Sequence, residues 1–309
     1  MFPFRFGVYA AVAPTMSAWR DQARMAEGLG YSTLYVSDHL DAQFGPLVAT
    51  TVAAEATSTL HVGSFVLNND FRHPVVLAKE IATLGLAAEG RVELGLGAGW
   101  LGSDYEQAGI EFDELAVRVD RLTESLAVMK MLWSEGEATL EGKYYTVRGA
   151  RCDPRPASPP RVMVGGGSKR LLTLAAREAD TVGINTNLSV GDKSDGTTSQ
   201  ATLDRYDRCL TWVREAAPDR FGSIELQIVA FATRAVASRR AAVRTATMLG
   251  LPGGEDALEL PIVLIGTPDE LCERLLERRE RWGFTNIVVP GEAMESFAPV
   301  VARLAGTAT

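Results

Sequence analysis

Several residue types that define protein classes are scarce in this chain of 309 residues. Its three cysteines, Cys152, Cys209 and Cys272, are scattered, which argues against a disulfide framework and favours a reducing, cytoplasmic location. Its three histidines show no metal-ligand spacing with those cysteines, so no structural metal is expected. No uninterrupted apolar run reaches the roughly 20 residues of a membrane helix, so no membrane association is expected.

An excess of basic residues is also missing. The chain has 31 Lys and Arg against 39 Asp and Glu, which gives a formal net charge of −8. Nucleic-acid binding needs a basic face, and no block of basic residues offers one, so we expect no nucleic-acid partner. The N-terminal segment MFPFRFGVYAAVAP is apolar, carries Arg5 and lacks a basic lead. It therefore predicts a first strand rather than a signal peptide.

The sequence does contain a repeated alternation of short apolar runs and helical patterns. The runs are RFGVYA, STLYVSDHL, LHVGSFVL, RVELGLGAGW, RVMVGGGS, ADTVGIN, SIELQIVAFA and TNIVVP. Helical spacing is clear between them, for example at Leu77, Ile81 and Leu84 after Pro74. Such alternation predicts a parallel sheet, and about eight units predict one α/β domain over residues 1–309, a (β/α)8 TIM barrel. An open doubly wound sheet is the alternative.

Two segments are expected to be insertions into this barrel. Residues 136–150 contain EATLEGKYYTVRG, which predicts a β-hairpin. Residues 186–202 include the polar stretch TNLSVGDKSDGTTSQ, which predicts either a lid or a disordered surface insertion.

Polar residues at the C-terminal ends of barrel strands are candidates for the active site. Asp38 and His39 end the second predicted strand, so His39 is a candidate acid or base. His61 precedes the third strand and is expected on the opposite, inert face. Asn68 and Asn69 follow the third strand. Amide side chains both donate and accept hydrogen bonds, which suits the edge of a flavin-like ring; without a ligand they are simply loop formers.

Two glycine-rich strand ends are candidate ligand contacts. Gly97–Gly102 has the form G-x-G-x-x-G, but WLGSDYEQAGIEFDEL is expected to be a loop, which disfavours a dinucleotide-binding helix. These glycines allow either close approach of a flat ligand or tight packing inside the barrel. The segment VMVGGGSKR opens a helix, which favours a phosphate site over a flexible turn at Gly165, Gly166, Gly167, Ser168 and Lys169.

These features resemble the bacterial-luciferase-like monooxygenase superfamily, and within it the branch that uses the deazaflavin coenzyme F420. FMN-dependent members look similar, so FMN is the alternative cofactor. The matching segments cover most of the chain in family order; they are AEGLGYSTLYVSDHL, VLNNDFRHPVVLAKEIATL, GRVELGLGAGW, the helix start at Arg118–Arg121, VGGGSKRLLTLAAREADTVGI and LIGTPDELCERLLERRERWGFTNIVV.

The resemblance implies where a cofactor would lie. A bulge with a non-prolyl cis peptide in the third strand would fall near Phe65-Val66 and support the ring, close to Asn68 and Gly97. Asp38 would contact the cofactor, and His39 would be the proton donor. The triple glycine and Ser168 would hold the phosphate.

One position departs from part of the family. Sugar-phosphate dehydrogenase members carry a glutamate after the fourth strand, where this chain has Trp100. An indole cannot transfer a proton, so that dehydrogenase mechanism is not expected. Trp100 is instead expected to form an aromatic substrate pocket with Tyr9, Phe44 and Phe65.

Three functional hypotheses follow from the resemblance. The first is an F420-dependent oxidoreductase that transfers a hydride between reduced deazaflavin and a C=C or C=N bond of a small molecule, with His39 protonating the other atom. The second is an FMN-dependent monooxygenase that uses O2 and a partner flavin reductase. The third is a non-catalytic flavin- or deazaflavin-binding barrel. A homodimer is expected. The polyglutamate tail of F420 would need a local positive patch from Lys169, Arg170 and Arg72.

Overall fold

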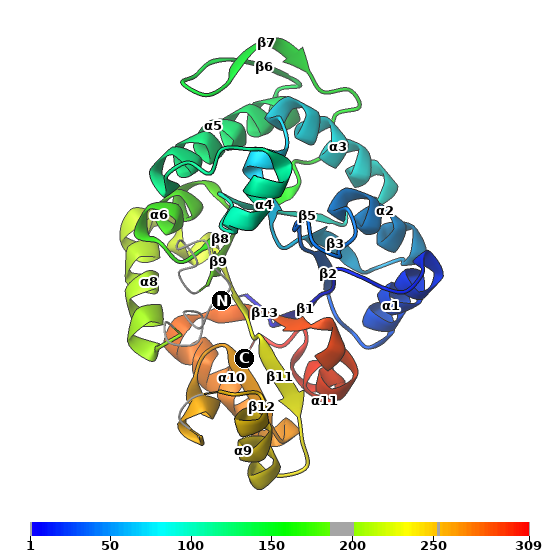
Figure 1. Cartoon of the computed structure of the whole chain (residues 1–309), viewed down its shortest axis with the longest axis vertical. Coiled ribbons are helices and arrows are strands. Elements are labelled where there is room, and N and C mark those ends of the chain that lie inside the picture. Colours follow the sequence, from blue (N-terminus) through cyan, green and yellow to red (C-terminus); the bar gives the residue numbers. More distant parts are fainter. Residues whose placement is uncertain (1, 186–200, 252–253, 309) are drawn as a thin grey trace.

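A computed structural model describes residues 2–185, 201–251 and 254–308 of the chain (Figure 1). Parallel strands close a barrel in the order β1, β2, β3, β5, β8, β9, β10 and β13, and β13 pairs again with β1. The predicted TIM barrel is therefore confirmed, and the open doubly wound alternative is wrong. The barrel strands are β1 (Arg5–Tyr9), β2 (Thr33–Val36), β3 (His61–Ser64), β4 (Leu67–Asn68), β5 (Val92–Gly97), β8 (Arg161–Gly166), β9 (Thr181–Ile184), β10 (Glu225–Val229) and β13 (Phe284–Pro290).

Helices surround the barrel and cover its outer face (Figure 1). The long helix α5 (Leu115–Ser134) buries an apolar stripe at spacings of three and four, formed by Val119, Leu122, Leu126, Met129 and Trp133. Short 3-10 segments in the described ranges join these elements: η1 (Asn69–Phe71), η2 (Pro218–Ser223), η3 (Asp256–Glu259) and η4 (Gly291–Ala293). The helices are α1 (Met16–Gly28), α2 (Pro46–Ala56), α3 (Pro74–Ala87), α4 (Gly102–Ala108), α5 (Leu115–Ser134), α6 (Lys169–Glu178), α8 (Leu203–Ala216), α9 (Arg239–Met248), α10 (Pro268–Trp282) and α11 (Met294–Leu304).

The third barrel position is shared by two short strands, β3 and β4. The peptide bond between Phe65 and Val66 separates them and is cis, at the position that the family resemblance implies. Strand β5 passes close to this bulge. A Cβ atom on Gly97 would lie 2.7 Å from Cγ2 of Val66, so only glycine leaves room for the bulge at this point of β5.

Additional elements project from the barrel at two places. The predicted hairpin is confirmed as the antiparallel pair β6 (Glu137–Glu141) and β7 (Thr146–Arg151), at the top of Figure 1. At the bottom of Figure 1, β11 (Ala232–Ala235) and β12 (Val263–Gly266) form a parallel pair outside the barrel sheet. The sequence pattern missed this pair, because β11 follows β10 without a polar break. The second expected insertion falls mainly on residues 186–200, outside the described part of the chain.

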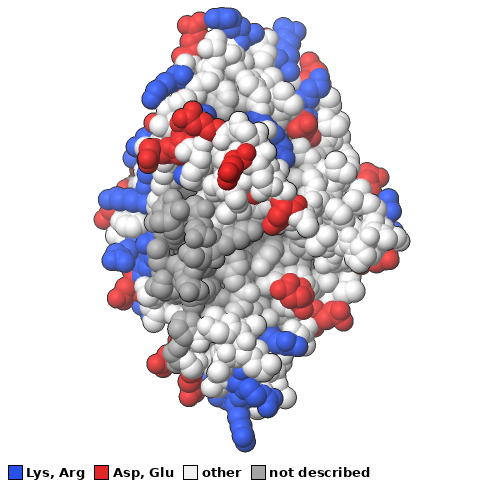
Figure 2. Space-filling view, in the orientation of Figure 1, with Lys and Arg blue, Asp and Glu red and all other residues white. Residues whose placement is uncertain are grey.

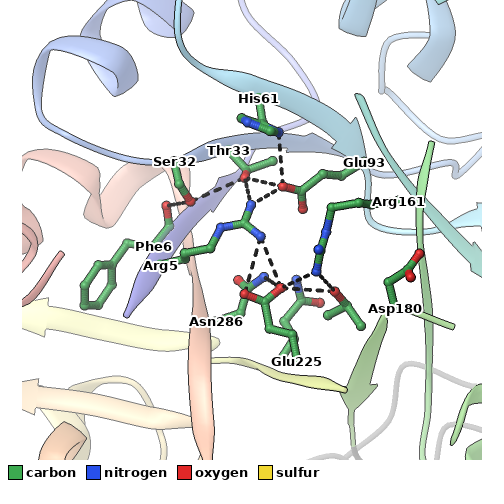
Figure 3. A network of polar contacts seen from close by, with 12 residues as sticks. Arg5, Phe6, Ser32, Thr33, His61, Glu93, Arg161, Asp180, Glu225 and Asn286 are labelled. Atoms are coloured by element: carbon green, nitrogen blue, oxygen red, sulfur yellow. Dashed lines mark hydrogen bonds and ion pairs between the residues drawn. The ribbon is translucent and has the colours of Figure 1, made fainter. Parts of the chain in front are cut away.

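A network of charged and polar side chains closes the N-terminal end of the barrel (Figure 3). Arg5 lies between the carboxylates of Glu93 and Glu225, 3.1 Å from Oε2 of Glu225, and both glutamates are buried. Thr181 donates to Glu225 over 3.0 Å. His61 begins β3 beside Glu93, at the end of the barrel opposite the β5 and β8 glycines, as expected. Burial of these carboxylates is tolerated because each is paired and hydrogen-bonded.

The sequence analysis also gave expectations about disulfides, metal sites and membrane helices. The three cysteines are buried and unpaired. The described residues contain no group of three or more His, Cys, Asp or Glu side chains arranged to hold a metal ion. No helix in the described ranges combines the length and apolar character that crossing a bilayer requires.

Candidate active site

A cavity of about 290 Å³ lies at the C-terminal ends of the barrel strands. This volume is near the lower limit for ligand pockets, and the position is where TIM barrels carry their active sites. Its lining joins segments far apart in the sequence, contributed by seven of the eight barrel positions, from the strands or the loops after them. The predicted residues that the structure brings together here are Tyr9, Asp38, His39, Phe65, Val66, Asn68, Gly97, Trp100, Gly165, Gly166, Gly167 and Ser168.

His39 forms a short polar contact with a buried carboxylate in the cavity wall. Its Nδ1 atom lies 2.6 Å from Oδ2 of Asp104, which is 3% exposed. A buried carboxylate next to Nδ1 favours the proton on that nitrogen and leaves Nε2 for exchange with a ligand. The indole of Trp100 meets the imidazole edge-on, with ring centroids 5.5 Å apart. The histidine is thus oriented by both a hydrogen bond and an aromatic contact.

Asp104 is a site residue that the sequence analysis missed. The stretch after Gly97 was expected to be a loop, but α4 begins at Gly102 and ends against the left-handed Gly109. The expected loop is therefore wrong at this point, because a seven-residue helix is too short to show a clear apolar periodicity. A helix does follow the G-x-G-x-x-G motif, yet the strand before it belongs to a closed barrel and not to an open dinucleotide-binding sheet.

Asp38 lines the cavity with its carboxylate already engaged. Arg72 donates to both carboxylate oxygens, over 2.5 and 2.9 Å, and the backbone nitrogen of Asn68 donates to Oδ2 over 2.9 Å. These contacts tie the end of β2 to the end of β4. Asp38 thereby fixes the wall of the cavity, in addition to any contact with a ligand.

The triple glycine ends β8 and leads into α6. Ser168 is the N-cap, and its hydroxyl accepts a hydrogen bond from the backbone nitrogen of Leu171 over 3.3 Å. A Cβ at position 166 would lie 2.3 Å from Cδ2 of Leu171, so a larger residue there would push this side chain aside. The guanidinium of Arg205, on α8, donates to the carbonyl of Gly167. Backbone N–H groups at the start of α6 therefore face the cavity end where an anion would bind.

The expected cationic patch is only partly present. Lys169 is exposed and does not line the cavity. Arg170 is paired with Asp120, and Arg72 is paired with Asp38. Lys and Arg side chains do gather at the left edge of Figure 2, over α6 and α8. Two of the three predicted cations are thus neutralised by carboxylates, and Arg205 was not anticipated.

Aromatic side chains form another wall, with one correction. Tyr9 stacks on Phe65 at a centroid distance of 6.3 Å and meets Phe231 edge-on at 6.4 Å. Burial, helped by the charge of Glu292, raises the pKa of Tyr9 to about 12, so its hydroxyl stays protonated at neutral pH. Phe44 was expected in this pocket, but its ring packs against Trp19 at 5.7 Å. Phe44 precedes α2, and its side chain points to the α1 side.

Other lining residues escaped the sequence analysis. Asn185 directly follows β9, so the rule that polar residues at strand ends are candidates could have found it. Phe231, by contrast, looked like the continuation of an apolar strand. Residues that line the cavity and were not predicted include Ser37, Gln43, Asp104, Leu115, Asn185 and Phe231.

Comparison with known proteins identifies the family of this chain. The sequence model of the family described as luciferase-like monooxygenase matches residues 1–249. F420-dependent glucose-6-phosphate dehydrogenase of Intrasporangium calvum is 34% identical over 170 residues, which are 52% of this chain and 51% of that protein. The enzyme of the same name from Nakamurella multipartita is 35% identical over 188 residues, 58% of this chain and 55% of that protein. The chain thus matches about half the length of these curated relatives.

Solved structures agree on the fold. An F420-dependent secondary alcohol dehydrogenase in complex with an F420-acetone adduct superposes with a TM-score of 0.76 at 19% identity, covering 98% of this chain and 99% of that one. EDTA monooxygenase from Chelativorans gives a TM-score of 0.77 at 16% identity, covering 99% and 95%. At such identities the likeness shows the barrel architecture alone.

Proposed function

Because the chain belongs to the luciferase-like monooxygenase family, we propose that it is an F420-dependent oxidoreductase acting on a small-molecule substrate. The observation that carries the proposal is one cavity that holds the His39–Asp104 pair, the Phe65-Val66 bulge and the triple glycine. Curated relatives that share a third of their aligned residues with this chain are named as F420-dependent, which supports the choice of cofactor.

The lining of the cavity fits a flat ring with an anionic stem. Phe65 and Val66 offer an apolar wall, and Gly97 lets that wall approach β5 closely. Asp38 and Asn68 supply polar groups at its edge. The stem would lie against the start of α6, where backbone N–H groups bind anions, held by Gly165, Gly166, Gly167 and Ser168.

The residues of this chain then have distinct roles in the reaction. When bound, reduced F420 would supply a hydride to a C=C or C=N bond of the substrate. Because Asp104 holds the proton on Nδ1, His39 would act as a donor in its doubly protonated form and deliver the Nε2 proton to the other atom of that bond. Trp100 would keep the imidazole in place and wall the substrate. Tyr9, Phe65 and Phe231 would exclude water from the reacting atoms.

The second candidate is an FMN-dependent monooxygenase fed by a flavin reductase. It is favoured by one observation: Arg72 and Arg170 are already paired with carboxylates, which leaves less positive charge for a polyglutamate tail. FMN has no such tail and needs only the phosphate site.

Fluorescence titration with F420 and with FMN tests the choice. We expect oxidised F420 to bind at micromolar or lower concentration and FMN to bind more weakly. Tight binding of FMN alone, together with O2 consumption by the reduced flavin, would establish the monooxygenase instead. Reduced F420 that is oxidised under anaerobic conditions by an added alkene or imine would support hydride transfer.

A homodimer formed through α2 and α3 is the oligomeric state that we propose. The side chains of Val48, Val76 and Leu86 on these helices are 65%, 55% and 56% exposed. The side of the molecule that carries α2 and α3 is mostly uncharged at the right of Figure 2. Glu55 is the one charged residue of α2, so this surface suits burial against a second copy.

A further inference from the structure

The Asn68 carboxamide is held in one orientation by its neighbours. Its Oδ1 atom accepts a hydrogen bond from the backbone nitrogen of Asp70 over 3.1 Å. A backbone N–H can only donate, so the atom that faces it is the amide oxygen, and a flipped amide would lose this bond. The hydroxyl of Tyr105 lies 3.1 Å from the same Oδ1.

A second layer of contacts holds this frame in place. Arg121 donates to both oxygens of Asp70 over 2.8 Å, and the Tyr105 hydroxyl lies 2.9 Å from Oδ2 of Asp70. Burial, together with the charge of Asp70, raises the pKa of Tyr105, so this hydroxyl remains a donor at neutral pH. The backbone nitrogen of Asn68 donates to Asp38. The residue is only 8% exposed, which leaves its side chain little freedom.

The amide nitrogen of Asn68, Nδ2, has different surroundings from the amide oxygen. No hydrogen bond joins Nδ2 of Asn68 to any residue in the described ranges, although Asn68 lines the cavity. We infer that Asn68 is a ligand-binding residue that acts only as a donor, through its NH2 group, to a carbonyl oxygen or an unprotonated ring nitrogen of the bound cofactor. The inference rests on the proposed function, which places the deazaflavin ring against this wall.

The donor assignment decides between two roles that the sequence analysis left open for the Asn68 amide. An amide could have served either as donor or as acceptor toward a ring edge. The amide oxygen is engaged inside the protein by the backbone N–H of Asp70, and the donor half remains. Ring edges that present N–H groups are therefore disfavoured at this position, and edges that present acceptors are selected.

The neighbouring Asn69 provides a matched control. Its Nδ2 atom lies 3.4 Å from both Oδ1 of Asp70 and the hydroxyl of Tyr145. Asn69 is buried but does not line the cavity. An Asn→Asp change at either position adds the same charge to the same loop, but only position 68 faces the ligand.

The test is fluorescence titration of wild type, Asn68→Asp and Asn69→Asp with oxidised F420 and with FMN. Asn68→Asp keeps an oxygen for the Asp70 N–H but replaces the NH2 donor with a carboxylate oxygen. We expect its Kd for F420 to rise by about 10- to 100-fold at pH 7.5. The Kd of Asn69→Asp should stay close to that of wild type. Thermal unfolding of all three proteins checks that each is folded.

A pH series separates loss of a donor from loss of structure. The groups that face position 68 are Asp38 with its partner Arg72, and Asp70 with its partner Arg121 and with Tyr105. Both carboxylates are paired, so burial is the main influence on a carboxyl introduced there and raises its pKa. Protonation restores an O–H donor. The affinity of Asn68→Asp should therefore recover toward that of wild type as the pH falls to about 5, relative to wild type in the same buffers.

The outcomes are distinct. A Kd of Asn68→Asp equal to that of wild type, or a weakening that is shared by Asn69→Asp and independent of pH, would overturn the donor assignment. If wild type binds FMN and not F420, the proposed cofactor is wrong, and the same comparison is made with FMN, whose ring also carries carbonyl oxygens. If wild type binds neither, both the proposed function and the role of Asn68 are overturned.

Discussion

At the scale of single residues, function depends on how a side chain is oriented rather than on its type alone. His39 is one of three histidines, and it differs from His61 and His73 in lining the cavity, where the buried carboxylate of Asp104 lies 2.6 Å from its Nδ1. That partner comes from 65 positions away along the chain and from a helix that covers the mouth of the cavity. Two predictions follow from this pair.

Replacement of His39 by Asn should impair turnover much more than cofactor binding. The amide fills a similar space but cannot transfer a proton at neutral pH, so kcat should fall by about 100-fold or more. The Kd for F420 should change by less than about threefold. Steady-state kinetics and fluorescence titration measure the two quantities. Equal losses in both would assign His39 to binding, and no loss in either would support a non-catalytic barrel.

Replacement of Asp104 by Asn should weaken the proton-donating form of His39. A neutral amide no longer stabilises a positive charge on the imidazole, so less of the ring carries the Nε2 proton that the reaction needs. We expect kcat to fall by about 10-fold or more and its pH profile to shift relative to wild type. Asp120→Asn, which changes an exposed carboxylate on α5, is the control. An unchanged pH profile for Asp104→Asn would contradict the positioning role.

At the scale of elements, the shape of the cavity depends on how closely the bulge between β3 and β4 approaches β5. The bulge between β3 and β4 places Val66 against Gly97 of β5, and Gly99 at the end of β5 has a positive φ of 76° next to Tyr105. Side chains at these glycines would displace the wall on which the ring is proposed to lie.

Gly97→Ala should weaken cofactor binding. The new Cβ would lie 2.7 Å from Cγ2 of Val66, a stiff β-branched side chain, so the bulge must move. We expect the Kd for F420 to rise by about 10-fold in the titration. The control is Gly85→Ala in α3, where a Cβ meets nothing within 4 Å. That change should leave the Kd unchanged and stabilise the protein by about 0.5–1 kcal/mol. Wild-type affinity in Gly97→Ala would show that the contact is not needed.

At the scale of the whole molecule, the barrel separates stability from function between its two ends. The N-terminal end is closed by the network of Arg5, Glu93 and Glu225 (Figure 3). The C-terminal end holds the cavity. Tyr35 links the two, because its hydroxyl donates to Glu93 over 2.8 Å and its ring packs on Phe65 at 5.8 Å.

Glu93 should make stability depend on pH in the acid range. Burial raises its pKa, but Arg5 and the Tyr35 hydroxyl outweigh burial and hold the pKa below 4.5. The folded state therefore releases this proton more readily than the unfolded state. The stabilisation is complete above the unfolded pKa and is lost as the pH falls through the folded value.

The corresponding variant is Glu93→Gln, which should lose about 3–5 kcal/mol of unfolding free energy at pH 7, because Arg5 loses a buried partner. The difference from wild type should shrink below about pH 4. Urea unfolding across pH measures both. Glu137→Gln, from an exposed pair with Arg151, should cost less than about 1 kcal/mol. A constant difference down to pH 3 would contradict the assignment to Glu93.

The proposed dimer gives a prediction for the surface. Val48→Glu should shift the protein from dimer to monomer in sedimentation velocity, because a charge would be buried at the centre of an apolar interface. Met248→Glu is the control, since Met248 is 80% exposed on α9, away from α2 and α3. A wild-type chain that sediments as a monomer at micromolar concentration would overturn the dimer itself.

The sequence by itself determined the barrel and the end of it that carries the site. Alternating apolar runs and helical stripes predicted eight strands in order, and strand ends then placed His39, Asn68, Gly97 and the triple glycine on one rim. This succeeds because the period of the backbone and the direction of parallel strands are local properties that apolar spacing records. The helix start at Thr267, with Glu270 completing its capping box, was predictable for the same reason.

Only the tertiary structure decided which side chains meet. Asp104 reaches His39, Arg72 neutralises Asp38, and Phe44 turns away to pack on Trp19. The amide of Asn68 keeps its donor for the cavity because the backbone N–H of Asp70 holds its oxygen. None of these pairs follows from spacing along the chain, since each joins elements whose relative position is set by packing of the barrel and its loops. Side-chain direction and partner choice are therefore properties of the folded molecule, whereas the strand order and the site-bearing end are properties of the sequence.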